Sequence, residues 1–200
     1  MTDFRQPPQT PDNTSNKAAE NKTNPVVEGL QTLGLSIVLA LGIRTFVAEA
    51  RYIPSGSMEP TLEINDRLVV EKISYHLNPP ERGDIIVFWP PESLFADEGN
   101  KRKDAFIKRV IGEPGETVEV RDGTVFIDGT PLAEDYIKAP PNYTWGPETV
   151  PPEAYLVLGD NRNSSFDSHA WEPDSYVPQE NIIGKAVVRF WPPSRIGGLN

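Results

Sequence analysis

Most of the chain after Arg51 is divided into short apolar runs that are separated by glycine, proline and charged residues. Runs this short, rich in Val, Ile and aromatic residues, are typical of β-strands. The strand candidates are Arg67–Ile73, Asp84–Trp89, Thr117–Val120, Thr124–Ile127, Tyr155–Leu158 and Ala186–Trp191. Arg121-Asp122-Gly123 and Asp128-Gly129 predict tight turns, and 21 Pro and 15 Gly in 200 residues disfavour a helical bundle. The sequence therefore predicts a mainly β protein built on antiparallel sheet.

One longer apolar segment, Val26–Ala48, precedes these runs. Its uncharged core, Thr32–Ile43, would span about 18 Å as a helix, whereas the hydrocarbon of a bilayer is about 30 Å thick. A spanning helix must therefore include the flanking residues, with the Arg44 side chain reaching toward the headgroups. A core this short also fits a cleavable signal peptide, since Ala48-Glu49-Ala50 offers an A-x-A cleavage pattern. Hydropathy alone leaves both possibilities open.

Composition restricts the remaining possibilities. Residues 1–24 are polar with almost nothing to bury, which predicts a disordered tail. With 29 acidic and 19 basic residues the formal charge is −10, so a nucleic-acid partner is not expected. Cysteine is absent and His76 and His169 are the two histidines, so we expect no metal site and no cofactor.

Two residues suggest serine hydrolase chemistry without a histidine base. Ser57 lies in Pro54–Pro60, a Pro-Ser-Gly-Ser-Met-Glu-Pro string, and Lys108 follows Phe106 and Ile107. A lysine acts as a general base when it is neutral, which requires its pKa to fall from about 10.4 toward 8 at a cost of roughly 3 kcal/mol. Burial of the amine among apolar neighbours would lower the pKa in this way. The alternative is an ordinary solvated lysine.

Both contexts, together with Gly159–Ser168, resemble the conserved boxes of type I signal peptidases, membrane serine proteases of the S26 family that remove leader peptides. The resemblance spans Leu33–Arg195. It implies an antiparallel β catalytic domain of the signal peptidase type with one N-terminal transmembrane helix. The expected division is a tail at 1–24, an anchor at 25–50 and a catalytic domain at 51–200.

The resemblance also implies roles for individual residues. Ser57 would be the nucleophile and Lys108 the general base of a Ser-Lys dyad. Ser55 would help the Ser57 N–H to hold the oxyanion, with turn capping as the alternative role for its hydroxyl. Ser165 would hydrogen bond the lysine, and Asp167 would be a buried carboxylate that orders the last box.

The sequence differs from many bacterial members after Asp167. His169 stands where those members carry arginine, and the Asp-Ser-His ending is similar to the cyanobacterial and plastid branch. The substitution removes the usual arginine partner of Asp167, so Arg109 or Arg162 is a candidate to replace it.

Substrates of such an enzyme would be precursor proteins that carry signal peptides, cut after small residues in an A-x-A pattern. Ile53, Met58, Leu62 and Ile107 are candidates to line the shallow apolar pockets, with ordinary core packing as the alternative. The resemblance favours a retained anchor in the lipid bilayer. The expected location is a single-pass protein of the plasma or thylakoid membrane, with the catalytic domain on the periplasmic or lumenal side.

Two other interpretations remain open from the residues alone. One is a classical triad in which Ser57 or Ser168 acts with His169 and an aspartate, leaving Lys108 structural. The other is a membrane-tethered β binding module without catalysis.

Overall fold

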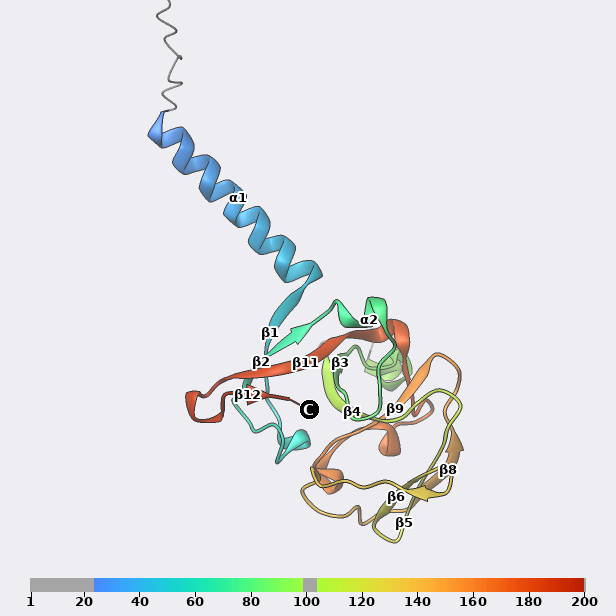
Figure 1. Cartoon of the computed structure of the whole chain (residues 1–200). Helices are drawn as coiled ribbons and strands as arrows, with labels where there is room; N and C mark the ends of the chain where they lie inside the picture. The colour runs from blue at the N-terminus through green and yellow to red at the C-terminus, as the bar shows by residue number, and fades with distance from the viewer. Residues whose placement is uncertain (1–23, 99–103, 200) are drawn as a thin grey trace, which may run out of the picture. The chain divides into compact units, whose positions relative to one another are not determined.

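The computed structural model describes residues 24–98 and 104–199, so most of the tail expected at 1–24 lies outside the described residues. The chain divides into two compact units, Met1–Leu39 and Ala40–Asn200. Described elements of the second unit are mainly antiparallel β-strands (Figure 1), which confirms the predicted fold class.

Helix α1 spans Pro25–Phe46, and none of its side chains is buried. Proline at its first position fits a helix start, because the missing N–H would have no partner inside the helix there. The helix is long and apolar enough to cross a membrane. It ends at Phe46, and Ala48 already begins a β-strand.

The large sheet has eight strands, in the order β1-β2-β11-β3-β4-β9-β10 with β12 paired to β11. Its strands are β1 (Ala48–Tyr52), β2 (Arg67–Glu71), β3 (Ile85–Phe88), β4 (Phe106–Gly112), β9 (Ala154–Leu158), β10 (Val177–Pro178), β11 (Ile182–Trp191) and β12 (Gly197–Gly198). Every pairing is antiparallel. Three of the predicted strands therefore meet side by side as β2, β11 and β3.

The small sheet has four strands in the order β7-β6-β5-β8. They are β5 (Thr117–Arg121), β6 (Thr124–Ile127), β7 (Thr130–Pro131) and β8 (Trp145–Thr149). Asp122 and Gly123 both have positive φ (51° and 76°), as do Asp128 and Gly129 (48° and 76°). Two such residues in succession are the geometry of type I′ hairpin turns, so both predicted turns are confirmed.

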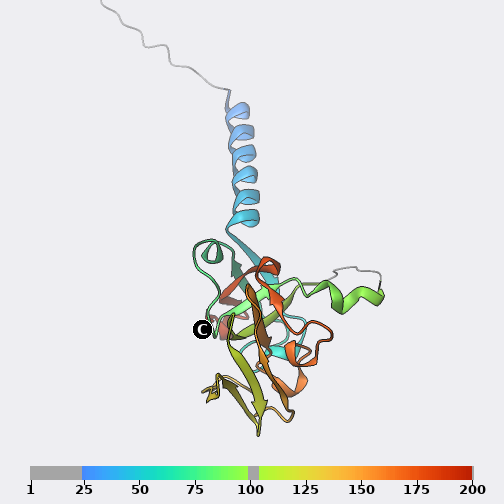
Figure 2. The same ribbon diagram turned by 90° about the vertical axis from the view of Figure 1, so that its right-hand side faces the viewer.

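The two sheets share one apolar cluster, to which β5 contributes Val118 and β9 contributes Leu156. Gly112 ends β4 at this contact, where an added Cβ would lie 2.6 Å from the Val118 side chain. Glycine is therefore required where the small sheet packs on the large one. Short helical segments complete the unit: η1 (Gly56–Met58), α2 (Ser74–Leu77), η2 (Glu92–Glu98), η3 (Arg162–Ser164), η4 (Ser168–Ala170), η5 (Gln179–Asn181) and η6 (Pro193–Arg195). Figure 2 shows η2, in green, extending away from the sheets.

Candidate active site

Ser57 lies in η1, a 3-10 helix of one turn that follows β1. The turn is anchored from below by apolar side chains: Met58 and Leu62 are fully buried, and Ile53 is 2% exposed. All three belong to the same core cluster. Because these side chains fill the space under the turn, the Ser57 side chain is left facing the opposite way, half-buried at the edge of a cavity.

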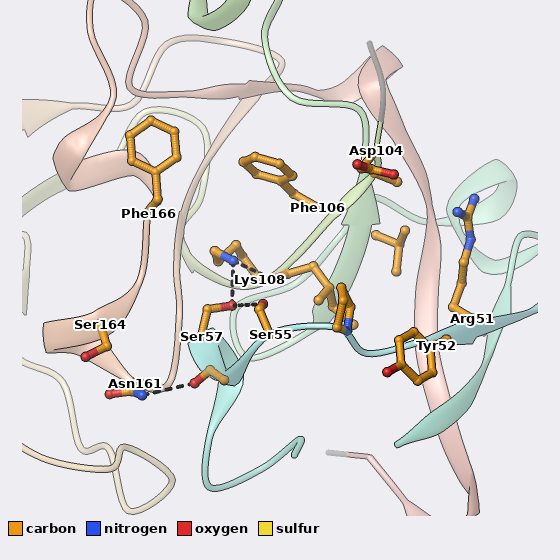
Figure 3. A pocket seen from close by; sticks show the side chains of 15 residues that line it. Arg51, Tyr52, Ser55, Ser57, Asp104, Phe106, Lys108, Asn161, Ser164 and Phe166 are labelled. Atoms are coloured by element: carbon orange, nitrogen blue, oxygen red, sulfur yellow. Dashed lines mark hydrogen bonds between the residues drawn. The ribbon is translucent and has the colours of Figure 1, made fainter. Parts of the chain in front are cut away.

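Lys108 lies in β4, and its amine reaches the serine hydroxyl. Its Nζ is 3.0 Å from Ser57 Oγ and 2.9 Å from the Ile107 carbonyl oxygen, to which it donates (Figure 3). The residue is 5% exposed. Burial lowers the pKa of Lys108 from 10.5 to about 8, against the opposing effect of the negative charges of Asp167 and Asp160. A substantial fraction of the amine is therefore neutral in mildly alkaline solution, as a general base requires.

The segment after β9 holds the carbonyl side of the serine turn. The Asn161 N–H donates to the Ser57 carbonyl oxygen at 3.0 Å, and Asn161 Nδ2 donates to the Gly56 carbonyl oxygen at 3.0 Å. Gly159 approaches so closely that an added Cβ would lie 2.5 Å from the Ser57 carbonyl oxygen. Sequence reasoning missed this role, because Asp160-Asn161-Arg162 also has the composition of an ordinary polar turn.

Two serines flank the dyad in different ways. Ser55 is exposed, and its Oγ lies 3.5 Å from Ser57 Oγ on the rim of the cavity. Ser165 Oγ is buried and has no hydrogen-bond partner among the described residues. The expected bond from Ser165 to Lys108 is thus not formed, because the hydroxyl packs against Gly159 while Lys108 donates to Ser57 and to the Ile107 carbonyl.

Asp167 is fully buried and accepts bonds from two directions. Gly159 N–H donates to one carboxylate oxygen at 2.8 Å, and His169 Nδ1 lies 2.6 Å from the other. The His169 ring is stacked on Tyr143 at 3.8 Å between ring centroids and 7° between planes. His169 is therefore the partner of Asp167, a role for which Arg109 and Arg162 were the candidates.

The two arginine candidates have other carboxylate partners. Arg109 forms a two-point pair with Asp160, with Nε to Oδ1 at 2.9 Å and an Nη2 to Oδ2 distance of 2.7 Å. Arg162 pairs with Glu134 through two bonds of 2.8 and 2.6 Å. The prediction that Arg109 or Arg162 replaces the arginine partner of Asp167 is wrong, since each guanidinium is already matched to another carboxylate.

A cavity of about 750 Å³ opens beside the dyad. Its lining comes from four parts of the chain: Arg51, Tyr52, Pro54, Ser55, Gly56 and Ser57; Val87 of β3; Asp104, Ala105, Phe106, Ile107 and Lys108; and Asn161, Ser164 and Phe166. Figure 3 shows Phe106 and Phe166 beside the lysine and Tyr52 farther along. Of the four residues predicted to line a substrate pocket, Ile107 lies on this wall. Ile53, Met58 and Leu62 lie in the core beneath the turn instead.

Comparison with known proteins matches the sequence to a family. The sequence profile described as signal peptidase, peptidase S26, matches residues 26–191. Signal peptidase I of Leptolyngbya laminosa is 63% identical over 192 residues, covering 96% of this chain and 93% of that protein. Probable signal peptidase I-2 of Synechocystis sp. is 55% identical over 186 residues, covering 93% and 83%. Thylakoidal processing peptidase 1, chloroplastic, of Arabidopsis thaliana is 43% identical over 163 residues, covering 80% and 47%.

Proposed function

Since the chain belongs to the signal peptidase family, peptidase S26, we propose that Ser57 and Lys108 form the dyad with which it removes signal peptides. The protein is a serine endopeptidase of the cyanobacterial and plastid branch, and its substrates are exported precursor proteins. The observation that carries the dyad assignment is the 3.0 Å contact between Ser57 Oγ and the amine of a lysine that is 5% exposed.

The reaction follows from the geometry of this contact. Neutral Lys108 accepts the Ser57 hydroxyl proton as Oγ attacks the scissile carbonyl carbon, and the carbonyl π electrons move onto oxygen. The Ser57 N–H and the Ser55 hydroxyl are the donors that we assign to this oxyanion. The ammonium of Lys108 then protonates the leaving amine as the C–N bond breaks. Lys108, neutral again, takes a proton from water as the water oxygen attacks the acyl carbon. When the bond between this carbon and Ser57 Oγ breaks, the Lys108 ammonium returns that proton to Oγ.

Supporting roles fall to two residues behind the dyad. Asp167 accepts from the Gly159 N–H and so fixes the segment that reaches the Ser57 carbonyl. Ser165 fills the space against Gly159. We therefore assign both residues to positioning the lysine base and its serine, without direct participation in bond making.

Preference for small residues before the cut has a steric basis in the cavity. Ile107 and Phe106 form an apolar wall immediately before Lys108, and Phe166 adds a second ring. A large substrate side chain between this wall and Ser57 would have to displace the wall residues, and such a displacement costs strain energy. A small side chain fits without it. This arrangement supports cleavage after an A-x-A pattern.

We propose that α1 is retained as a single-pass anchor in the lipid bilayer of the plasma or thylakoid membrane. Ala48, Glu49 and Ala50, the alternative signal-peptide cleavage pattern, belong to β1 and pair with Glu71, Val70 and Val69 of β2. Cleavage after Ala50 would divide a strand of the large sheet, which argues against a removable leader. Exported precursors become accessible on the periplasmic or lumenal side, where we place the catalytic unit.

The test is cleavage of a leader-bearing precursor by the full chain in detergent. Wild type should release the mature protein at a small residue, as read by intact mass, while Ser57→Ala and Lys108→Met should each lose about 10⁴-fold or more in rate. Circular dichroism of each variant checks that the fold is retained. Full activity of either folded variant would end the dyad assignment, and precursor binding without cleavage by wild type would favour the binding-module alternative.

A further inference from the structure

The segment Glu134–Lys138, which follows β7 and leads toward β8, contacts three parts of the chain that carry or hold the dyad. Its alternate residues Glu134, Tyr136 and Lys138 reach three different targets. The targets are the loop after β9, strand β4 and the turn after Ser57. We call Glu134–Lys138 the connecting segment, because it joins the small sheet to these three parts.

The contact to the loop after β9 is the most buried of the three. Arg162 has a side chain that is 0% exposed, and the Glu134 side chain is 5% exposed. Besides its two bonds to Glu134, Arg162 donates from Nε to the Gly159 carbonyl oxygen at 3.0 Å. The guanidinium therefore closes the loop from Gly159 to Arg162, and Glu134 is the carboxylate that neutralises it. Asn161, which holds the Ser57 carbonyl, lies inside this closed loop.

The other two contacts lie on either side of the first. The Arg109 guanidinium stacks 4.0 Å from the Tyr136 ring centroid, and the Tyr136 hydroxyl donates to Glu134 at 2.7 Å. Lys138 donates from its backbone N–H to the Asp160 carbonyl oxygen at 2.9 Å and from Nζ to Glu59 at 2.8 Å. The Lys138 side chain is 51% exposed, so its ion pair is expected to contribute little.

We propose that Glu134 is a positioning residue for cleavage. Its ion pair with Arg162 keeps Asn161 against the Ser57 carbonyl. This contact keeps the serine hydroxyl within reach of the Lys108 amine, so the proposal rests on the proposed dyad function. The connecting segment thereby contributes to catalysis through a residue that does not contact the dyad.

The physical reason is that a buried guanidinium requires a charged partner. Without the Glu134 carboxylate, Arg162 retains its bond to Gly159, but the desolvation penalty of its buried charge is no longer offset by an ion pair. Movement of the loop toward water would relieve this penalty. Such a movement carries Asn161 with it. A displacement of about 1 Å in a reacting group lowers a rate by about 10²-fold, whereas substrate affinity depends on the cavity wall formed by Phe106 and Ile107.

The kinetic test compares Glu134→Gln with wild type and with a matched control in detergent-solubilised full chain. Glu119→Gln is the control, because Glu119 forms a partly exposed ion pair with Arg121 in the small sheet, away from the loop after β9. For Glu134→Gln, kcat for a precursor peptide should fall by about 10-fold to 100-fold with KM changed less than about threefold. Glu134→Asp should recover part of the loss, and Glu119→Gln should match wild type. All rates are measured well below the thermal midpoint of each variant.

Hydrogen exchange supplies a readout that does not require activity. Peptides covering residues 56–60 and 159–165 should exchange faster in Glu134→Gln than in wild type or Glu119→Gln, since the Asn161 N–H loses its fixed acceptor. Tyr136→Phe, which removes one bond to Glu134 and keeps the ring on Arg109, is the milder variant if Glu134→Gln does not fold. It should show the same exchange pattern with a kcat loss of about twofold to fivefold.

The outcomes separate this inference from the proposed function. Wild-type kcat and unchanged exchange in folded Glu134→Gln would overturn the positioning role while leaving the dyad intact. Equal losses in Glu134→Gln and Glu119→Gln would also overturn it, because the effect would then not depend on the buried pair. Absence of cleavage by folded wild type would overturn the proposed function, and unchanged exchange in the same preparation would overturn the positioning role separately.

Discussion

Lys108 and Arg109 are neighbours in β4 and both side chains are buried, but the protein treats their charges in opposite ways. Lys108 has no ion pair among the described residues and is surrounded by apolar groups, so burial lowers its pKa to about 8. Arg109 lies on the other face of the strand and forms a two-point pair with Asp160. On one face of the strand burial favours the neutral form of Lys108, and on the other face Asp160 compensates the charge of Arg109.

The difference assigns separate tasks to the two faces. A lysine that is easily deprotonated is a base, and its burial costs folding free energy. A paired guanidinium cannot be deprotonated, and it holds the segments that carry the base in place. Asp160 also accepts from Thr61, beyond the serine turn, at 2.5 Å. The face of Arg109 should therefore determine stability, whereas the face of Lys108 should determine activity.

The largest effect on stability is expected on the Arg109 face. Asp160→Ala removes the carboxylate from a guanidinium that stays buried, so the free energy of unfolding should fall by about 3–5 kcal/mol. Denaturant titration of the full chain in detergent measures this change. Glu119→Gln, which breaks a partly exposed pair, should lower the free energy of unfolding by less than about 1 kcal/mol. Similar small losses in both variants would show that the buried pair on the Arg109 face contributes no more to stability than the Glu119–Arg121 pair.

Lys108→Met should instead raise the free energy of unfolding. The folded pKa of about 8 lies below the unfolded value of 10.5, so the buried amine destabilises the protein fully below pH 8. At pH 7 the variant should be more stable than wild type by up to about 3 kcal/mol. The penalty declines between pH 8 and 10.5 and vanishes above 10.5, so the two stability curves should converge there. Destabilisation by Lys108→Met at pH 7 would contradict the comparison.

The burial of Lys108 could be predicted from the sequence, but the ion-pair partner of Arg109 could not. The apolar neighbours of Lys108 are adjacent to it in the chain, so its burial could be inferred from a short window. The partner of Arg109 lies 51 positions away, and nothing local in the sequence indicates which carboxylate a guanidinium meets. For the same reason Arg109 was a candidate partner for Asp167, a position that His169 occupies.

Fold prediction had a similar limit. Strands with continuous apolar runs, such as β3 and β9, were predicted because a buried strand has apolar residues at consecutive positions. β1 was missed because Ala48–Tyr52 is no apolar run, with Glu49 and Arg51 among its five residues, and the pairing with β2 that makes it a strand is not local. The resemblance made Ile53, Met58 and Leu62 candidates for a substrate pocket, with core packing as the alternative. They lie in the core, and sequence could not decide between the two because residues near a nucleophile can face either side.

The pH dependence of cleavage refines the description of the Lys108 face. The rate should rise with pH through about 8, since the neutral amine is the base. The negative charge of Asp167 raises the pKa of this lysine. Asp167→Asn keeps an oxygen for the Gly159 N–H and removes the charge, so the midpoint of the kcat/KM profile should move to lower pH. A midpoint that stays in place, or moves to higher pH, would remove Asp167 from the electrostatics of the base.

The smallest effect is expected from His169→Ala. His169 contacts Asp167 at 2.6 Å and stacks on Tyr143, but the carboxylate retains its bond from the Gly159 N–H after the substitution. Loss of one hydrogen bond of this kind corresponds to less than about tenfold in rate. The alkaline midpoint of the pH profile should remain, because a histidine base would instead act from about pH 6.5. A folded His169→Ala variant with no activity would revive the classical triad, in which the histidine, and not the buried lysine, takes the serine proton.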